Sequence, residues 1–148
     1  MMALESDYAD LLRAFNDNGV AYLVVGAHAV GYHAEPRATL DFDVWIERSP
    51  HNAKRVFKAL ASFGAPLDRI KAEDFERSQL VFQVGIQPLR IDILTDIDGV
   101  NFEDAYKTRV NGMILDVPAP IIGRAALIAN KRAAGRDKDF VDLRRLER

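Results

Sequence analysis

Hydrophobic and polar positions at the start of the chain follow first the period of a helix and then that of a strand. Apolar residues recur at the i, i+3, i+4, i+7 spacing of an amphipathic helix at Tyr8, Leu11, Leu12 and Phe15. Ser6 is a suitable N-cap, and Asn18-Gly19 would end this helix. Residues 20–26 form a short apolar run rich in β-branched residues, which predicts a buried strand.

A second strand is predicted at 41–47, where the character of the residues alternates. Asp41 and Asp43 would share one face of this strand, with apolar residues on the other, because side chains alternate across a strand. The dipeptide Ser49-Pro50 follows, an N-cap with proline at the first helical position. Apolar residues at helical spacing continue from there to Gly64, so a helix is predicted between them.

The second half of the chain alternates short strands with helices. Residues 65–78 are polar and irregular, which is typical of a connection. Strands at 80–84 and 89–94 would form a hairpin across the residues between them. A short helix is expected at 102–106.

The pattern of the last forty residues predicts a hairpin and two helices. Residues 109–117 contain Asn111-Gly112, a strong turn signal, which we expect to form the tip of a second hairpin. Helices are expected at 120–134 and 137–147, separated by Gly135.

These elements favour one α/β domain over residues 1–148. Their order predicts a mixed β-sheet flanked by helices, with a core over about 1–118 and a C-terminal helical segment over about 119–148. Hydrophobic residues make up 49% of the chain and charged residues 28%, which is ordinary for a folded globular protein. There is no cysteine, which excludes a disulfide framework and thiolate metal sites.

Charge is distributed unevenly along the chain. Residues 124–148 carry eight Lys or Arg and four Asp or Glu, a balance of +4, so the net charge of −2 leaves −6 on the first 123 residues. The basic segment could face phosphates or nucleic acid, although a solvated amphipathic helix has a similar composition. No segment resembles a signal peptide or a membrane span, so we expect a cytoplasmic protein that does not act in a membrane.

Asp41 and Asp43 are candidate metal ligands, since residues i and i+2 of a strand lie a few ångströms apart on one face. Two carboxylates on a dry face repel one another, and a hard divalent cation removes that repulsion. Magnesium prefers oxygen ligands and commonly uses one or two carboxylates together with substrate phosphates. Asp92, within the apolar run 89–94, would complete the cluster if its strand lies beside 41–47. The alternative for each aspartate is an exposed position on a strand.

The first predicted strand runs into two small residues, Gly26-Ala27, ahead of an expected helix. Small residues let backbone amides approach a phosphate, and a helix N-terminus favours anions through its free N–H groups and its dipole. Tight packing of a helix on a strand would produce the same pattern.

Together these residues resemble the minimal nucleotidyltransferase superfamily, in particular small bacterial members related to abortive-infection and toxin–antitoxin proteins. In that superfamily a strand ends in Gly-Gly or Gly-Ser, a helix follows, and the next strand carries two aspartates separated by one apolar residue. The matching segments here are Gly26-Ala27, residues 37–46, Asp92, Lys131 and Lys138-Asp139.

The resemblance implies transfer of a nucleoside monophosphate from a nucleoside triphosphate to an acceptor, with pyrophosphate as the leaving group. Asp41 and Asp43 would ligate magnesium, and Asp92 would hold a second metal ion and help to deprotonate the acceptor. The acceptor would be a protein, an RNA or a small molecule.

The resemblance implies that five residues bind the nucleotide and its phosphates: Gly26, Ala27, Arg37, Thr39 and Lys131. Ala27 replaces the usual second glycine or serine, so no hydroxyl group is present there. For Arg37 the alternative is a surface ion pair, and for Lys131 it is a solvated helix lysine.

Two other functions fit the sequence. A catalytically silent nucleotide-binding or antitoxin module would keep the fold and act through a toxin–antitoxin partner or a homo-oligomer, and Ala27 favours this interpretation. An RNA-binding protein would use the basic segment 124–148 and be indifferent to the carboxylates. Phe140 is the one aromatic residue in that segment, fewer than single-strand binding surfaces usually carry.

Overall fold

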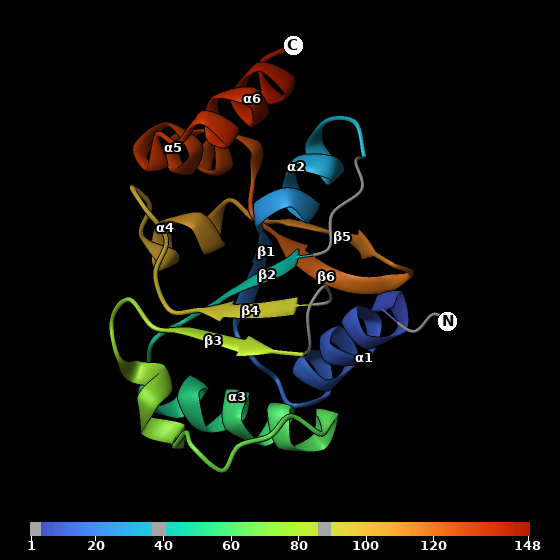
Figure 1. Cartoon of the computed structure of the whole chain (residues 1–148), viewed down its shortest axis with the longest axis vertical. Coiled ribbons are helices and arrows are strands. Elements are labelled where there is room, and N and C mark those ends of the chain that lie inside the picture. The colour runs from blue at the N-terminus through green and yellow to red at the C-terminus, as the bar shows by residue number, and fades with distance from the viewer. Residues whose placement is uncertain (1–3, 37–40, 86–89) are drawn as a thin grey trace.

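The computed structural model describes residues 4–36, 41–85 and 90–148. Within these residues six strands form one mixed sheet with the order β3-β4-β2-β1-β6-β5 (Figure 1). The strands are β1 (Tyr22–Val25), β2 (Asp41–Ile46), β3 (Val81–Val84), β4 (Arg90–Leu94), β5 (Val110–Ile114) and β6 (Val117–Ile121). The helices are α1 (Leu4–Asp17), α2 (Gly26–His33), α3 (Pro50–Phe63), the 3₁₀ helix η1 (Ala72–Glu76), α4 (Phe102–Lys107), α5 (Arg124–Ala134) and α6 (Asp137–Leu146).

Strand β2 lies inside the sheet, between β1 and β4. It pairs antiparallel with β1 and parallel with β4, and β3 is the antiparallel partner of β4. On the other side of β1, β6 pairs with it in parallel and with β5 antiparallel. The mixed α/β sheet is therefore confirmed. The strand of Asp92 lies beside the strand of Asp41 and Asp43, which was the condition for Asp92 to join their cluster.

The two faces of β2 contact different helices. Phe42 stacks on Tyr8 of α1, with ring centroids 4.7 Å apart. On the opposite face Trp45 packs edge to face against Phe102 of α4, with centroids 5.0 Å apart. Figure 1 shows α1 and α3 on one side of the sheet and the α5–α6 pair on the other. Strand alternation thus directs the two aspartates of β2 toward the side of α5 and α6.

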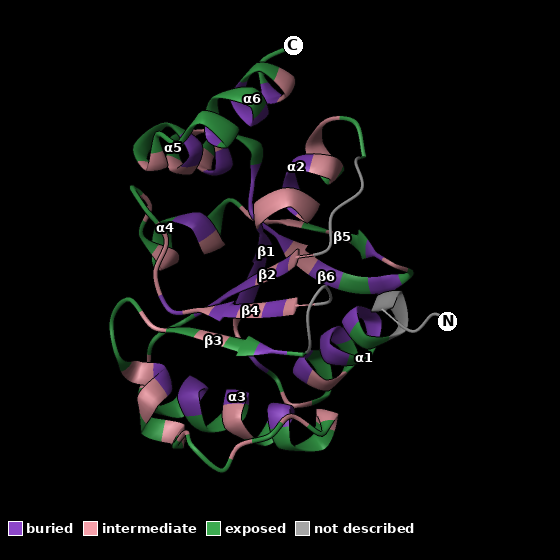
Figure 2. Cartoon of the chain, viewed as in Figure 1, coloured by how far each residue is buried: buried purple, intermediate pink, exposed green. Residues whose placement is uncertain are grey.

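The buried residues gather on the sheet and on the helix faces that cover it (Figure 2). Leu11, Leu12 and Phe15 of α1 are fully buried, and so are all four residues of β1. The apolar positions that predict these two elements are therefore the positions that fill the core. No helix in the described part of the chain has the length and apolarity needed to cross a lipid bilayer.

Helix α3 begins and ends as its sequence predicts. The Ser49 hydroxyl accepts a hydrogen bond from the N–H of Asn52 at 3.1 Å, and Pro50 occupies the first turn. Gly64 ends the helix in the left-handed conformation, with φ 97°. The Asn52 side chain also bonds the N–H and the carbonyl of Ala21, which ties α3 to the start of β1.

The second hairpin turns at a different place from the one predicted. Its tip is Leu115-Asp116, with φ 51° and 64°, whereas Asn111-Gly112 lies within β5. Tyr32 explains the glycine, because a Cβ at Gly112 would lie 2.5 Å from the Tyr32 hydroxyl oxygen. A residue with a Cβ would therefore displace the exposed Tyr32 side chain, so this glycine accommodates a distant contact and not a turn.

Two helix starts also differ from the predictions. The first helix begins at Leu4, so Ser6 lies inside it and does not precede it as a cap. The helix expected from residue 120 begins at Arg124, because the residues up to Ile121 continue strand β6. The β3–β4 hairpin is present, but residues 86–89 of its connection lie outside the described residues.

Candidate active site

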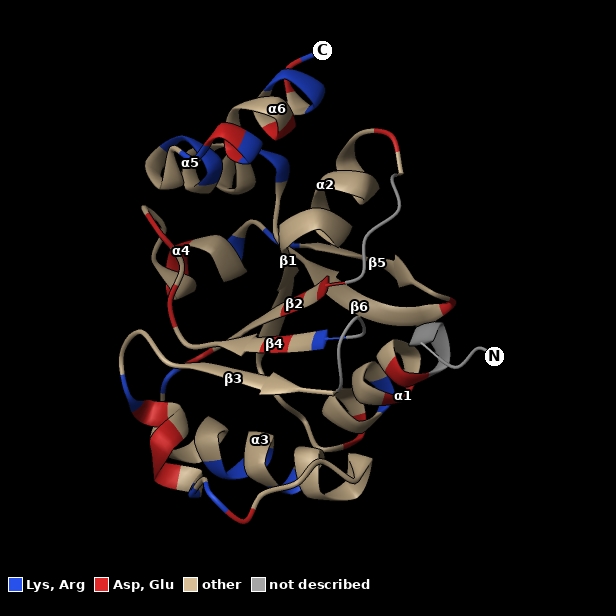
Figure 3. Ribbon diagram, in the orientation of Figure 1, with Lys and Arg blue, Asp and Glu red and all other residues tan. Residues whose placement is uncertain are grey.

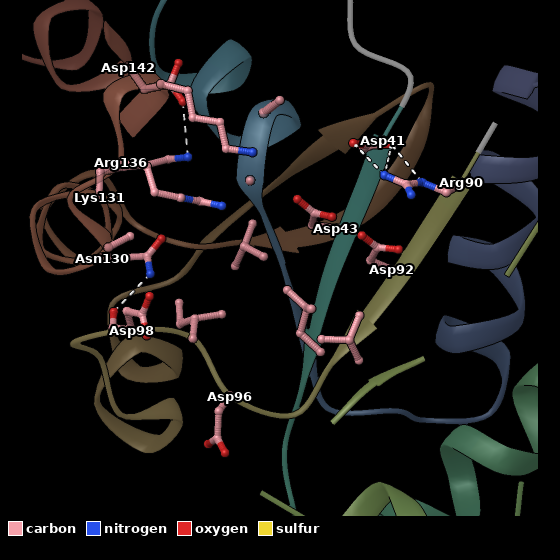
Figure 4. Close-up of a pocket in the computed structure, with 18 residues that line it drawn as sticks. Asp41, Asp43, Arg90, Asp92, Asp96, Asp98, Asn130, Lys131, Arg136 and Asp142 are labelled. Atoms are coloured by element: carbon pink, nitrogen blue, oxygen red, sulfur yellow. Dashed lines mark hydrogen bonds and ion pairs between the residues drawn. The ribbon is translucent and has the colours of Figure 1, made fainter. Parts of the chain in front are cut away.

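Parallel pairing of β2 with β4 places two aspartates side by side. In this register Asp43 lies opposite Asp92, and Asp41 lies opposite Arg90. All four side chains line a cavity of about 690 Å³ (Figure 4). The sheet therefore brings together the three carboxylates predicted from the sequence, and it adds an arginine to them.

Gly26, at the β1–α2 junction, lies directly against one of these carboxylates. Its φ is +68°, a conformation that residues with a Cβ rarely adopt. A Cβ at this position would also lie 2.2 Å from Asp43 Oδ2. Both the backbone conformation and the contact with Asp43 therefore require glycine here.

Burial and mutual repulsion raise the pKa of the paired carboxyl groups. The pKa of Asp43 is raised to about 6, first by burial and then by the charges of Asp92 and Asp41. Burial also raises the pKa of Asp92, against the opposing effect of the nearby Arg90 guanidinium. Asp92 Oδ1 is buried and has no hydrogen-bond partner among the described residues. The positive groups nearby therefore compensate the charge of the pair only in part.

Asp41 differs from the other two aspartates because it forms an ion pair with Arg90. Arg90 Nη2 lies 3.3 Å from Asp41 Oδ1, and 46% of the Asp41 side chain is exposed. In residues 4–36, 41–85 and 90–148, no three His, Asp or Glu side chains are arranged to hold a metal ion together. The cluster expected from the sequence is thus a close pair, Asp43 and Asp92, with a third aspartate held by an arginine.

The Asp43–Asp92 pair has the chemistry of a divalent-cation site. Carboxylate oxygens are the ligands that magnesium prefers, and Asp92 Oδ1 has an acceptor position to offer. A cation between the two groups would relieve the repulsion that raises the pKa of Asp43. The residues present therefore fit a magnesium ion.

Three positive side chains from α5 and α6 line the same cavity: Lys131, Arg136 and Lys138. Lys131 is buried, so the alternative of a solvated lysine is wrong. Its Nζ lies 3.1 Å from Asp142 Oδ2 and 3.4 Å from Asp139 Oδ1. The charges of Lys131 and Lys138 also act on Asp43 and partly offset the rise in its pKa.

One buried carboxylate, Asp139, holds two of these cations. It accepts hydrogen bonds from Arg136 Nε at 2.7 Å and from Arg136 Nη2 at 3.1 Å, besides its contact with Lys131. It also accepts the backbone N–H of Arg136 at the start of α6. Burial would raise the pKa of Asp139, but the hydrogen bonds from Arg136 lower it to about 2. Asp139 therefore remains ionised and fixes both cations at the cavity wall.

Figure 3 shows how the charges are arranged in space. Lys and Arg gather on α5 and α6, while red positions lie on the neighbouring strands β2 and β4. The cavity thus has Lys131, Arg136 and Lys138 on the side of the C-terminal helices and the Asp43–Asp92 pair on the sheet. Asp142 and Arg90 add one residue of the opposite charge to each side.

The cavity contains six of the eight predicted site residues: Gly26, Ala27, Asp41, Asp43, Asp92 and Lys131. Arg37 and Thr39 lie outside the described residues. Ala27 lines the cavity and provides no hydroxyl group.

Several lining residues were not among the predicted site residues: Arg90, Asp96, Asp98, Asn130, Arg136, Lys138 and Asp142. Lys138 lies in a segment that the resemblance matched, but no role was predicted for it. One signal was available in α6, where Asp139 and Asp142 share a helix face with Leu143 and Leu146. Carboxylates on the apolar face of an amphipathic helix predict buried partners for them.

Comparison with solved structures identifies the fold. The chain superposes with a TM-score of 0.62 on a crystal structure from Thermotoga maritima that is provisionally described as a nucleotidyltransferase. The match covers 96% of this chain and 93% of that chain, at 15% sequence identity. No protein-family profile and no curated protein sequence matches the chain significantly. The chain therefore has a nucleotidyltransferase-like fold, as its motifs implied.

Proposed function

We propose that this protein is a magnesium-dependent nucleotidyltransferase, which transfers a nucleoside monophosphate from a nucleoside triphosphate to an acceptor. The observation that carries the proposal is the Asp43–Asp92 pair, which shares one cavity with Lys131, Arg136 and Lys138. Carboxylates and cations in one cavity suit a substrate that brings phosphates and a divalent cation together. The nucleotidyltransferase-like fold supports the same function.

Lys131 and Arg136 would bind the triphosphate. Asp139 holds both side chains in place before any nucleotide enters, which reduces the entropy that binding costs. The Arg136 side chain remains 59% exposed, so its guanidinium group can also donate to phosphate oxygens. Gly26 and Ala27, at the start of α2, would let the backbone approach the phosphates.

Asp43 and Asp92 would hold magnesium, and Asp41 would join them when Arg90 releases it. A bound cation would neutralise charge on the phosphates and on the attacking oxygen. Arg90 has a place to go after release, since its side chain also lines the cavity that the phosphates would enter.

In the transfer step an acceptor oxygen forms a bond to the α-phosphorus, while the bond from that phosphorus to the pyrophosphate oxygen breaks. Asp92 would accept the proton of the acceptor as a general base. Lys131 and Arg136 would stabilise the negative charge that gathers on the departing pyrophosphate.

Isothermal titration of ATP, GTP, CTP and UTP, each with and without magnesium, tests this proposal. We expect one or more of the four to bind the wild-type protein with magnesium, and binding to fall at least tenfold in the double variant Asp43→Asn with Asp92→Asn. Asp17→Asn is the matched control, because Asp17 is an exposed aspartate of α1 outside the cavity.

Failure of every triphosphate to bind the folded wild-type protein would contradict the proposal. That result would favour a silent module that keeps the fold and binds a partner protein. Binding that is equal in the double variant would place the nucleotide away from the carboxylates and would also contradict it.

A further inference from the structure

A second cavity lies where the end of α2 meets α5 and α6. It has a volume of about 170 Å³ and is lined by His33, Ala34, Glu35, Arg124, Arg145 and Arg148. It shares no described lining residue with the cavity of the Asp43–Asp92 pair. Three of its lining residues are arginines and one is a carboxylate, so the second cavity is positively charged.

Two of the arginines are anchored on the end of α2. Arg124 Nη1 donates to the carbonyl oxygen of His33 at 3.3 Å, and Arg145 Nη2 donates to the carbonyl oxygen of Glu35. Backbone carbonyls at the end of a helix lack partners within the helix, so they are natural acceptors for these groups. The anchoring holds guanidinium groups from two different helices beside the same cavity.

Capping of α2 does not account for all of this arrangement. Arg145 Nη1 is buried and has no hydrogen-bond partner among the described residues. A buried donor without an acceptor is unfavourable, and a charged donor is more so. Nη1 is closed to solvent in this arrangement, so an anion in the second cavity would supply the missing acceptor when the Arg145 guanidinium group turns toward it.

We propose that the second cavity binds a phosphate group, carried either by the backbone of an RNA acceptor or by a small phosphorylated molecule. Guanidinium groups bind phosphate through paired N–H donors, and three arginines line this cavity. The cavity is smaller than the roughly 300–1,000 Å³ typical of small-molecule sites, so it suits one anionic group and not a whole nucleotide.

The position of the second cavity relates it to the candidate active site. Arg136 and Lys138, at the start of α6, line the cavity of the Asp43–Asp92 pair, here called the first cavity. Arg145 and Arg148, at the end of α6, line the second cavity. A strand of RNA that runs along α6 would reach both. The phosphate site itself is independent of the proposed transferase activity, whereas its use by an RNA acceptor rests on that activity.

Titration of inorganic phosphate, followed by backbone amide NMR without nucleotide and with EDTA, tests the site. We expect saturable shifts at residues 33–35, and an affinity at least roughly tenfold lower in the double variant Arg124→Gln with Arg148→Gln, since it removes two charge-assisted hydrogen-bond donors. Both arginines are exposed, so the variant should fold, and its amide spectrum verifies this. Arg144→Gln is the matched control, an exposed arginine of α6 that does not line the second cavity.

The variant Asp43→Asn with Asp92→Asn separates this inference from the proposed function. Shifts at residues 33–35 should persist in that variant, whether or not the protein binds nucleotides. A single-stranded RNA titrated at several salt concentrations identifies the carrier. If RNA is the carrier, log affinity should fall less steeply with log salt in the arginine double variant. The magnitude of this negative slope should decrease by about 0.7 for each RNA phosphate that the variant no longer neutralises.

An unchanged slope together with weakened binding of inorganic phosphate would assign the site to a small phosphorylated molecule. The proposal is overturned if residues 33–35 show no saturable shift in the folded wild-type protein. It is also overturned if the Arg124→Gln, Arg148→Gln variant binds phosphate there as well as the wild type does.

Discussion

Gly26 and Gly64 both have positive φ, +68° and +97°, but their surroundings differ. A Cβ at Gly26 would lie 2.2 Å from Asp43 Oδ2, while a Cβ at Gly64 would meet no atom of the described residues within 4 Å. We expect Gly64→Ala to lower the free energy of unfolding by about 1–2 kcal/mol, the cost of the left-handed conformation. Gly26→Ala should cost a further 1–3 kcal/mol, roughly, through overpacking.

Urea unfolding of the two glycine variants measures this difference directly. Gly26→Ala should also abolish nucleotide binding, because relief of the clash moves the Asp43 carboxylate. Equal losses of stability in the two variants would contradict the close contact between Gly26 and Asp43.

Asp43 should make the stability of the metal-free protein depend on pH. Its pKa in the folded state is about 6, above the ordinary aspartate value of about 3.9. The folded state therefore holds the proton more tightly, and the contribution of Asp43 to stability falls as the pH rises from about 4 to about 6. Asp43→Asn removes this loss, so at pH 8 with EDTA it should be more stable than the wild type by roughly 1–3 kcal/mol.

The gain from Asp43→Asn should shrink as the pH falls toward about 4 and vanish below about pH 3, where Asp43 is protonated in both the folded and unfolded states. Urea unfolding at several pH values checks the trend. A difference in stability that stays constant between about pH 4 and 7 would show that burial and the neighbouring aspartates do not raise the Asp43 pKa.

At the scale of elements, the sequence predicts features that depend on neighbouring residues. It does not predict features that depend on contacts between residues far apart in the chain. Helix α3 begins at Ser49-Pro50 and ends at Gly64. Both limits depend on groups within the helix and its caps, so they follow from the sequence. Asn111-Gly112 carries the sequence signature of a turn, but Gly112 lies within β5, against the side chain of Tyr32 from α2. No periodicity within the strand indicates such a contact.

The candidate site divides in the same way. The alternation of β2 predicted that Asp41 and Asp43 share a face, and the apolar run around Asp92 made it a candidate third carboxylate. Lys131 was implied by the resemblance alone. The pairing of Asp41 with Arg90 depends on the register between β2 and β4, which the sequence does not determine. The hydrogen bonds of Arg136 to Asp139 place a cation that sequence reasoning did not select.

Lys131 ties α5 to α6, and its replacement should be costly. Lys131→Met would leave Asp139 and Asp142 buried without their shared cation. We expect a loss of about 3–5 kcal/mol in the free energy of unfolding, as for other buried ion pairs with one partner removed.

Lys107→Met is the control, since the ion pair of Lys107 with Glu103 lies on the surface, with side chains 68% and 79% exposed. It should change the stability by less than about 1 kcal/mol. Thermal and urea unfolding give both values. Similar small effects from the two substitutions would show that Lys131 does not link the helices.

At the scale of the whole molecule, the predicted C-terminal segment is not separate from the sheet, because its first residues belong to strand β6. A division near residue 118 would cut β6 (Val117–Ile121), which lies between β1 and β5. The helices that follow carry the cations of the first cavity, so the site needs both parts of the chain. We therefore propose that the described residues form one folding unit, with the candidate active site between the sheet and the α5–α6 pair.

We propose that Asp43 and Asp92 form a divalent-cation site whose affinity for the cation also depends on the phosphates of a nucleotide. Electron paramagnetic resonance of Mn²⁺, a substitute for magnesium, measures free and bound ion directly. We predict that the wild-type protein binds Mn²⁺, that a triphosphate tightens this binding, and that Asp43→Asn with Asp92→Asn abolishes both effects. Equal binding of Mn²⁺ to the folded wild-type protein and to the folded double variant, with and without a triphosphate, would contradict the account.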